Sequence, residues 1–318
     1  MRLGSASFKP FNKMMQKERR AAVTAQVKMQ EAEKREVQLV QFSVQGQIKK
    51  WEENVVDRKI SWKEMWSWSA SRMSFLLRST FDTLPSPRNL VRWKVEKEDR
   101  CRCGKPGTMR HILSNCGLAL NRYEWRHNEV LKVIFEEMTV HINNSNDGNK
   151  PQKRNPARSI RFIRPGGGLT STSRKSTIDD QRWNGKWTIA ADLPGAKKRF
   201  LIPTSKRPDI FLWCDETKML EIVELTVPFE DNIEDARERK IKRYEKLTER
   251  CKEEGWKAWH SPIEVGCRGY IGVKTRKWFL SVGFSQKKTA QILKKIQEVV
   301  EKASHWIWLK REDVSWLE

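Results

Sequence analysis

The chain has 318 residues, a length that can hold two domains of ordinary size. Charged residues make up 32% of the sequence, but 15 tryptophans and 12 phenylalanines supply enough core material to exclude a wholly disordered chain. The formal net charge of +23 favours a polyanionic partner. No apolar run reaches the roughly 20 residues that span a bilayer, and the N-terminus lacks the apolar region of a signal peptide. We therefore expect an intracellular protein that binds DNA or RNA and does not enter a membrane.

The first 80 residues read as a basic, helical N-terminal region. Residues 13–57 are rich in Glu, Lys, Arg and Gln and contain few helix breakers, which predicts a long helix or a pair of helices. This segment is either a solvated, partner-seeking helix or a direct contact for nucleic acid. In residues 62–80, apolar side chains at near-helical spacing predict a core-facing stripe and not a stacking platform for bases; they are Trp62, Met65, Trp66, Met73 and Leu76.

A cysteine cluster defines the next region, residues 81–142, after a turn at Pro85-Ser86-Pro87. The pattern Cys101-x-Cys103-x7-His111-x4-Cys116 offers three thiolates and one imidazole, the ligand set of a tetrahedral zinc site. Four protein ligands leave no open position for water, so the predicted role of Zn²⁺ is structural. The alternative is a group of buried cysteines beside a surface histidine. A helix from about 119 to 140 is expected to follow.

Residues 143–181 contain many Asn, Ser, Thr, Gly and Arg and no apolar period, which predicts a flexible basic linker. Beyond it, residues 182–318 alternate strand and helix patterns and form the second predicted domain. Strands are expected at 187–191, 210–213, 219–227, 263–265 and 270–273, with helices at 229–254 and 286–305. The fold class is therefore α/β (α+β).

Two carboxylates stand at the edges of a predicted β-hairpin. Asp209 follows Arg207-Pro208 at the start of the strand 210–213, and Glu224 lies fourteen residues further on, in the returning strand. Glu224 shares a face with Leu220, Ile222 and Thr226 by the two-residue strand period. An acid on an apolar face is costly unless it is paired or binds a cation. The pair therefore predicts a Mg²⁺ site.

The helix after the hairpin brings basic residues to the same region. Ala236, Lys240, Arg243, Tyr244 and Leu247 fall on one helix face. Lys240 can reach the carboxylates, where it would orient and deprotonate a water or offset the charge of a pentavalent phosphate. The alternative is an ordinary capped helix with solvated cations.

The string Arg207-Pro208-Asp209-x14-Glu224, with Ala236-x3-Lys240-x2-Arg243-Tyr244, resembles the restriction-like endonuclease of certain non-LTR retrotransposons, a branch of the PD-(D/E)xK nucleases. In those nucleases the lysine usually follows the second acid by two positions, where this chain has Thr226. The cysteine cluster is similar to the CCHC module that precedes this nuclease. Further similar strings are residues 122–128, 191–195, 264–269 and Trp306-x-Trp308. The resemblance covers residues 80–312.

The resemblance implies a Mg²⁺-dependent enzyme that nicks chromosomal DNA in the nucleus, with a reverse transcriptase as a partner in trans and RNA as a second ligand. The implied catalytic residues are Asp209, Glu224, Lys240, Arg243 and Tyr244. No aromatic-x-Asp-Asp polymerase box is found, which leaves a truncated element or a separately used piece as expectations. A catalytically silent nucleic-acid-binding remnant is the alternative, and a helical partner-binding protein acting through residues 13–57 is a third possibility.

Five further residues belong to the predicted site. Asp192 and Glu264 are candidates for an additional acid at the metal. Arg207, Arg126 and His127 are candidates for contacts with nucleic acid, although a histidine at a helix boundary also suits a structural role.

Overall fold

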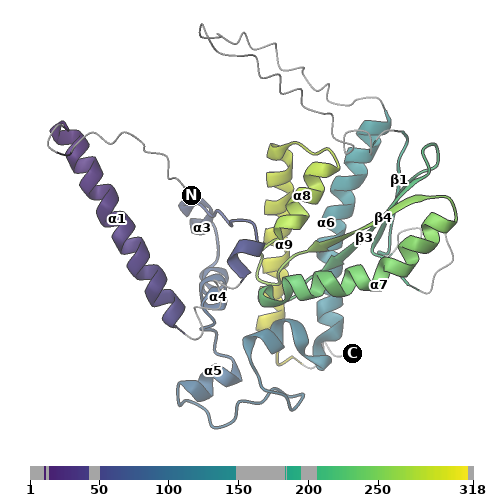
Figure 1. The fold of residues 1–318 in the computed structure, drawn as a ribbon. Helices are drawn as coiled ribbons and strands as arrows, with labels where there is room; N and C mark the ends of the chain where they lie inside the picture. Colours follow the sequence, from purple (N-terminus) through teal and green to yellow (C-terminus); the bar gives the residue numbers. More distant parts are fainter. Residues whose placement is uncertain are drawn as a thin grey trace, which may run out of the picture. The chain divides into compact units, whose positions relative to one another are not determined.

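The computed structural model describes residue 11 and residues 14–42, 51–147, 183, 185–194 and 206–313. The chain separates into two compact units, Met1–Lys50 and Trp51–Glu318. The first unit contains α1 (Gln16–Gln41), a helix of 26 residues within the predicted 13–57 segment (Figure 1). Residues 43–50 of that segment lie outside the described part. None of the described helices is long and apolar enough to cross a membrane.

The second unit is built on a mixed four-stranded sheet in the order β1–β2–β3–β4. The strands are β1 (Thr188–Ala191), β2 (Ile210–Cys214), β3 (Met219–Thr226) and β4 (Lys257–Glu264). The first three pair antiparallel, and β4 runs parallel to β3. The parallel crossover is made by α7 (Ile233–Glu253), preceded by the 3₁₀ turn η7 (Glu230–Asn232). The α+β class predicted from the sequence is confirmed.

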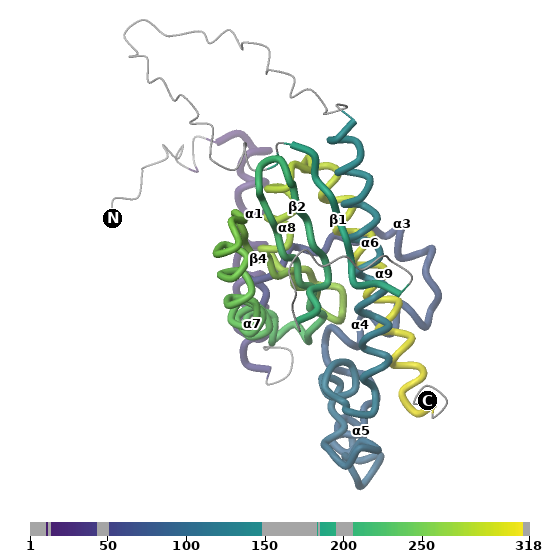
Figure 2. Tube along the Cα trace, turned by 90° about the vertical axis from the view of Figure 1, so that its right-hand side faces the viewer, coloured from purple at the N-terminus to yellow at the C-terminus, as the bar shows by residue number. Residues whose placement is uncertain are grey.

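Helices cover both faces of the sheet (Figures 1 and 2). On one face, Leu220 and Ile222 of β3 pack with Tyr244 and Leu247 of α7. On the other face, alternate residues of β3 pack against α6 (Leu120–Asn146), α8 (Val273–Ser281) and α9 (Gln286–Leu309). The two-residue alternation along β3 therefore decides which carboxylates face α7, and Glu224 is one of them.

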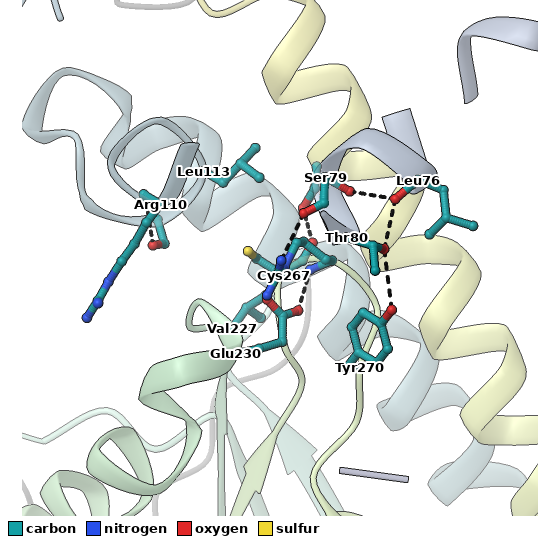
Figure 3. A network of polar contacts seen from close by, with 12 residues as sticks. Leu76, Ser79, Thr80, Arg110, Leu113, Val227, Glu230, Cys267 and Tyr270 are labelled. Atoms are coloured by element: carbon teal, nitrogen blue, oxygen red, sulfur yellow. Dashed lines mark hydrogen bonds and ion pairs between the residues drawn. The ribbon is translucent and has the colours of Figure 1, made fainter. Parts of the chain in front are cut away.

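Short helices precede the cysteine cluster: η3 (Glu52–Asn54), α3 (Trp62–Trp66), α4 (Ala70–Thr80) and α5 (Pro87–Arg92). Buried ion pairs join this segment to the rest of the unit, since Arg58 and Arg72 both contact the fully buried Glu301 of α9. Arg268 makes a similar connection, because its guanidinium binds Glu230 at 2.6 Å and donates to the Ser79 carbonyl at 2.9 Å. Figure 3 shows Ser79, Glu230 and Cys267 meeting at this junction.

The predicted core stripe over residues 62–80 is wrong for its two tryptophans. Trp62 and Trp66 are 74% and 78% exposed, whereas Phe75 and Leu76 of α4 are buried. The five-residue helix α3 places the two tryptophan side chains on one face. Spacing of this kind shows that residues share a face, but it does not show that another element covers that face.

Several predicted boundaries also move. The helix expected over 119–140 continues to Asn146, into the first residues of the predicted linker, whose residues 148–181 lie outside the described part. The strand expected at 263–265 is the end of β4, which begins at Lys257. No strand forms at 270–273: Ile271 and Gly272 make only isolated bridges, with Val265 and Val55, and α8 begins at Val273. The sequence-predicted boundaries at 81 and 182 both fall inside the second unit.

Candidate functional site

The hairpin of β2 and β3 places Asp209 directly beside Glu224. Ile210 pairs with Val223 in the register, so the preceding and following residues meet at the end of the hairpin strands. The backbone N–H of Asp209 donates to Glu224 Oε2 at 3.3 Å. In return, the N–H of Leu225 donates to Asp209 Oδ2 at 2.7 Å. The two carboxylates are therefore neighbours that are held by the backbone of the opposite strand.

The first turns of α7 lie over this end of the hairpin and carry a lysine to it. Lys240 Nζ forms an ion pair with Glu224 Oε1. One turn later, Tyr244 is fully buried, and its hydroxyl donates to the Arg207 carbonyl at 3.3 Å. Arg243 is exposed, and its guanidinium lies 5.6 Å from the Tyr244 ring centroid. The structure thus brings Asp209, Glu224 and Lys240 together, with Tyr244 beneath them and Arg243 outside.

A histidine reaches the same carboxylates from α6. His127 Nε2 lies 3.2 Å from Asp209 Oδ2 and 3.3 Å from the carbonyl oxygen of Leu225. Its Nδ1 lies 3.2 Å from Asn128 Oδ1. Burial opposes protonation of His127, but its hydrogen bond to Asp209 raises the pKa of the imidazole overall. His127 therefore acts as a cationic or donating neighbour of Asp209.

Burial of the acid pair has an electrostatic cost. Only 3% of Glu224 is exposed. Burial raises the pKa of Glu224, and the nearby Asp209 carboxylate raises it further, while Lys240 acts in the opposite direction. Two carboxylates this close repel each other strongly in a poorly solvated site. A proton or another cation bound between them relieves that repulsion.

A cavity of about 410 Å³ opens above these groups. Its wall combines the hairpin end, α7, α6 and the segment between the last two residues of the cysteine cluster, His111 and Cys116. Acidic and basic side chains both line it. The acids are Glu124, Asp209 and Glu224, and the basic residues are Arg126, His127, Arg239 and Lys240. A site with buried carboxylates and cations at its wall can accept a divalent cation together with an anionic ligand.

The predicted metal cluster also assembles. The donor atoms of Cys101, Cys103, His111 and Cys116 all lie within 4.8 Å of one another. Cys101 Sγ and Cys116 Sγ are 3.8 Å apart, and Cys103 Sγ lies 3.1 Å from His111 Nε2. Tetrahedral zinc with bonds of 2.0–2.3 Å requires donor separations of roughly 3.3–3.8 Å. The residues therefore form a site that can hold a metal ion and is consistent with zinc.

Local backbone geometry explains how closely spaced cysteines meet. The N–H of Cys101 donates to the Lys105 carbonyl at 2.8 Å, and the N–H of Gly104 donates to the Cys101 carbonyl at 2.8 Å. Gly104 adopts a positive φ of 82°, which a residue with a side chain rarely tolerates. Burial lowers the pKa of His111, and the charge of Lys105 lowers it further, so the ring stays in its neutral, ligating form.

Two side chains join the metal cluster to the cavity. Tyr123 Oη accepts from the Cys116 N–H at 3.1 Å and donates to the Ile112 carbonyl at 2.7 Å. Arg126 donates to the Leu113 carbonyl at 2.9 Å and to the Val227 carbonyl at 3.4 Å. The loop that carries the last two metal ligands and the strand end that carries Glu224 are thus bound to the same turn of α6.

The remaining predicted residues lie outside the acid pair. Asp192 binds the exposed Arg207, with Arg207 Nε 2.9 Å from Asp192 Oδ2, and neither lines the cavity. Glu264 is 1% exposed and pairs with Arg237 at 3.1 Å. Arg126 is 1% exposed, and its guanidinium is bonded to protein groups. This burial gives Arg126 a structural position rather than a surface contact.

Three groups at the site carried no signal in the sequence. Arg239 and Ser114 line the cavity, and Arg237, which does not line it, pairs with Glu264. The two arginines are among many cations of α7, and nothing in the sequence singles them out. No protein-family model matches the chain, and no curated protein matches it significantly.

Proposed function

We propose that the chain is a metal-dependent DNA endonuclease of the restriction-like type, with a structural zinc centre beside its active site. The observation that carries the proposal is the convergence of Asp209, Glu224 and Lys240 at one cavity. Asp209 directly precedes β2, Glu224 lies in β3 and Lys240 in α7. Glu224 connects the three, through its ion pair with Lys240 and the hydrogen bond from the Asp209 N–H. This combination matches the spacing by which the sequence resembles the nuclease of non-LTR retrotransposons.

The carboxylates would hold Mg²⁺, which prefers oxygen ligands and keeps several of its waters. When bound there, the ion supplies charge to the phosphate and acidifies a bound water. Lys240 is placed to orient the attacking water and to offset charge on the phosphate. His127 holds one oxygen of Asp209, so the other is available to a cation. Asp192 and Glu264 have no part in this proposal, since each already pairs with an arginine.

The proposed zinc centre has a structural task. Its four protein ligands saturate a tetrahedral ion, so it would not bind water or substrate. It would instead fix the loop 111–116, which supplies Ser114 and Asn115 to the wall of the cavity. The Lys and Arg side chains behind the net charge of +23 would bind the phosphates of the DNA backbone, and such contacts do not depend on the base sequence. A chromosomal substrate would place the protein in the nucleus, alongside a reverse transcriptase and RNA as further partners.

The test is nicking of a supercoiled plasmid in the presence of Mg²⁺ or Mn²⁺. The zinc-loaded wild type should convert the plasmid to the open circle, and D209N and E224Q should each lose at least about a hundredfold in rate, as expected when a metal ligand is removed. Asp215→Asn is the matched control, because this exposed acid in the β2–β3 turn loses the same charge. Equal rates in all four proteins would overturn the proposal.

A second candidate is a nucleic-acid-binding protein without catalysis. The observation that favours it is the ion pair itself, because Lys240 already neutralises Glu224 in the described structure. This candidate predicts tight, salt-dependent DNA binding, no nicking with either metal, and the same affinity in wild type and D209N.

A further inference from the structure

A second cavity lies beside the metal cluster, and Cys101 and Cys116 of the cluster line it. It measures about 460 Å³, within the roughly 300–1,000 Å³ of pockets that bury small ligands. It shares no lining residue with the acid cavity. Its walls come from the loop of Cys101, the beginning of α6 and the C-terminal end of α9.

The floor of this cavity is apolar. Pro87, Ile112, Ala119 and Ile307 form it, next to Cys101 and Cys116 of the metal cluster, which also line the cavity. Ile112 and Ala119 are each 7% exposed, and Ile307 is 1% exposed, so the floor belongs to the packed core and is fixed in place. A packed, apolar floor favours a ring system over a hydrated ion, because it offers contact area and no hydrogen bonds.

The rest of the lining is strongly basic, although one of its arginines, Arg122, is only 3% exposed. Four arginines line the cavity, Arg100, Arg102, Arg122 and Arg311, against the single acid Glu312. Backbone carbonyl oxygens hold these guanidinium groups in place: Arg100 donates to Gly104 at 2.7 Å, and Arg102 donates to Glu312 at 3.0 Å. A carbonyl fixes a guanidinium without neutralising it, so both retain their charge and further N–H donors. Arg311 lies 3.3 Å from the Glu312 carboxylate, which is 78% exposed.

We propose that this cavity binds one unpaired nucleotide of a nucleic-acid strand, with the base on the apolar floor and the phosphate among the arginines. Guanidinium groups suit phosphate because they donate two parallel hydrogen bonds and stay charged. A base within a duplex is stacked and paired and cannot enter unless it is flipped out, so the site selects single strands or frayed ends. The inference takes nucleic acid as the ligand from the proposed function, but it does not depend on cleavage.

The experiment is a binding assay without magnesium, in which nicking plays no part. Fluorescence anisotropy of the full-length, zinc-loaded chain is measured with a single-stranded DNA, the matching RNA and the matching duplex. The double variant R100Q/R102Q should weaken single-strand binding by about tenfold or more, as expected for lost charge-assisted hydrogen bonds, and duplex binding by less than about threefold. Preference between the DNA and RNA arms identifies the natural strand.

The matched control is R250Q/R276Q, two exposed arginines of α7 and α8 that do not line the cavity. It lowers the net charge by the same two units and should weaken single strand and duplex alike, through general electrostatics. If R100Q/R102Q behaves in this same uniform way, the arginines supply only general charge and the nucleotide site is rejected.

A third variant tests the floor with the charges intact. Ala119→Leu narrows the cavity, and a 2-aminopurine base in the single strand reports on it. Wild type should change the emission of this base on binding, and A119L should not. No emission change with the wild type overturns the proposal. Zinc content and unfolding temperature check the folding of each variant, and the arginine pair stands as the test if A119L fails to fold. Failed nicking with intact strand selectivity would reject only the nuclease.

Discussion

His127 Nε2 lies 3.2 Å from Asp209 Oδ2, which connects the helix after the cysteine cluster with the strand that carries the first acid. The same oxygen accepts the Leu225 N–H at 2.7 Å. Two donors therefore fix one oxygen of the carboxylate and set its orientation toward the cavity. In the proposed nuclease, the imidazole is a positioning group for a metal ligand and does not contact the metal.

Removing that imidazole should weaken the affinity for Mg²⁺ more than it lowers the nicking rate at saturating Mg²⁺. We expect H127A to raise the Mg²⁺ concentration for half-maximal nicking by about tenfold, the lower end of the effect of losing a partner of a metal ligand. H127Q, whose amide can still donate to Asp209, should recover part of that loss. A merely destabilised protein would show fewer active molecules and an unchanged Mg²⁺ dependence, and that result would contradict the positioning role.

Loss of one cluster ligand should unfold the metal region. C116S is expected to lower zinc from about one ion per chain to near zero and to reduce the unfolding temperature, because structural zinc contributes about 10 kcal/mol or more in small modules. Nicking should fall with it, since Tyr123 and Arg126 join this loop to the acid cavity. Elemental analysis and calorimetry measure both effects. Cys251→Ala, a buried cysteine outside the cluster, should keep its zinc.

Arg126 should be a strong determinant of stability. Its guanidinium is 1% exposed and serves three acceptors, the carbonyls of Leu113 and Val227 and the Ser304 hydroxyl. R126M leaves these acceptors without a donor, so we expect the free energy of unfolding in urea to fall by about 2–4 kcal/mol. Arg250→Met at an exposed position should change it by less than about 0.5 kcal/mol. Equal values for the two variants would show that the Arg126 bonds contribute nothing.

Glu264 should make stability fall as pH rises. Burial raises its pKa to about 7, although Arg237 opposes the shift. The folded state therefore holds a proton that the unfolded state releases above about 4.3. Stability declines from there and levels off only above pH 7, once Glu264 is ionised in both states. The decline amounts to roughly 3–4 kcal/mol at 1.36 kcal/mol per unit.

The measurement compares unfolding free energies of wild type and E264Q from pH 4.5 to 8. The difference between the two proteins should change across this window in favour of E264Q at high pH, because the side-chain amide of the variant does not titrate. A pH-independent difference would contradict the raised pKa. Thr275 anchors the same backbone position through two hydrogen bonds, so the fold around residue 264 should survive the substitution.

The hairpin and its acids could be predicted because their signals are local. The two-residue alternation in β3 separates Glu224 from Glu221, and Pro208 and Pro228 bound the two strands. In the structure, Glu224 faces Lys240, while Glu221 on the opposite face accepts from the Trp278 indole at 2.8 Å. The cysteine cluster could be predicted for the same reason, since its four ligands lie within sixteen residues.

The errors concern contacts between distant parts of the chain. The exposure of Trp62 and Trp66 depends on what packs over α3, which periodicity cannot show. Likewise, Arg126 was predicted to contact nucleic acid. In the structure, α6 places it between the cysteine segment and the end of β3, where its guanidinium donates to three acceptors. The pairing of Glu264 with Arg237 also depends on β4 lying parallel to β3. The register of these two strands is not fixed by any local sequence pattern.

The most direct test of the acid site locates the divalent cation itself. Fe²⁺ bound in place of Mg²⁺ on the zinc-loaded protein, with ascorbate and peroxide, produces radicals that cut the nearby polypeptide. We expect backbone cuts around Asp209 and Glu224 that excess Mg²⁺ suppresses and that D209N/E224Q abolishes. Cuts confined to other segments, or cuts at these residues that persist in the double variant, would contradict a cation held by this carboxylate pair.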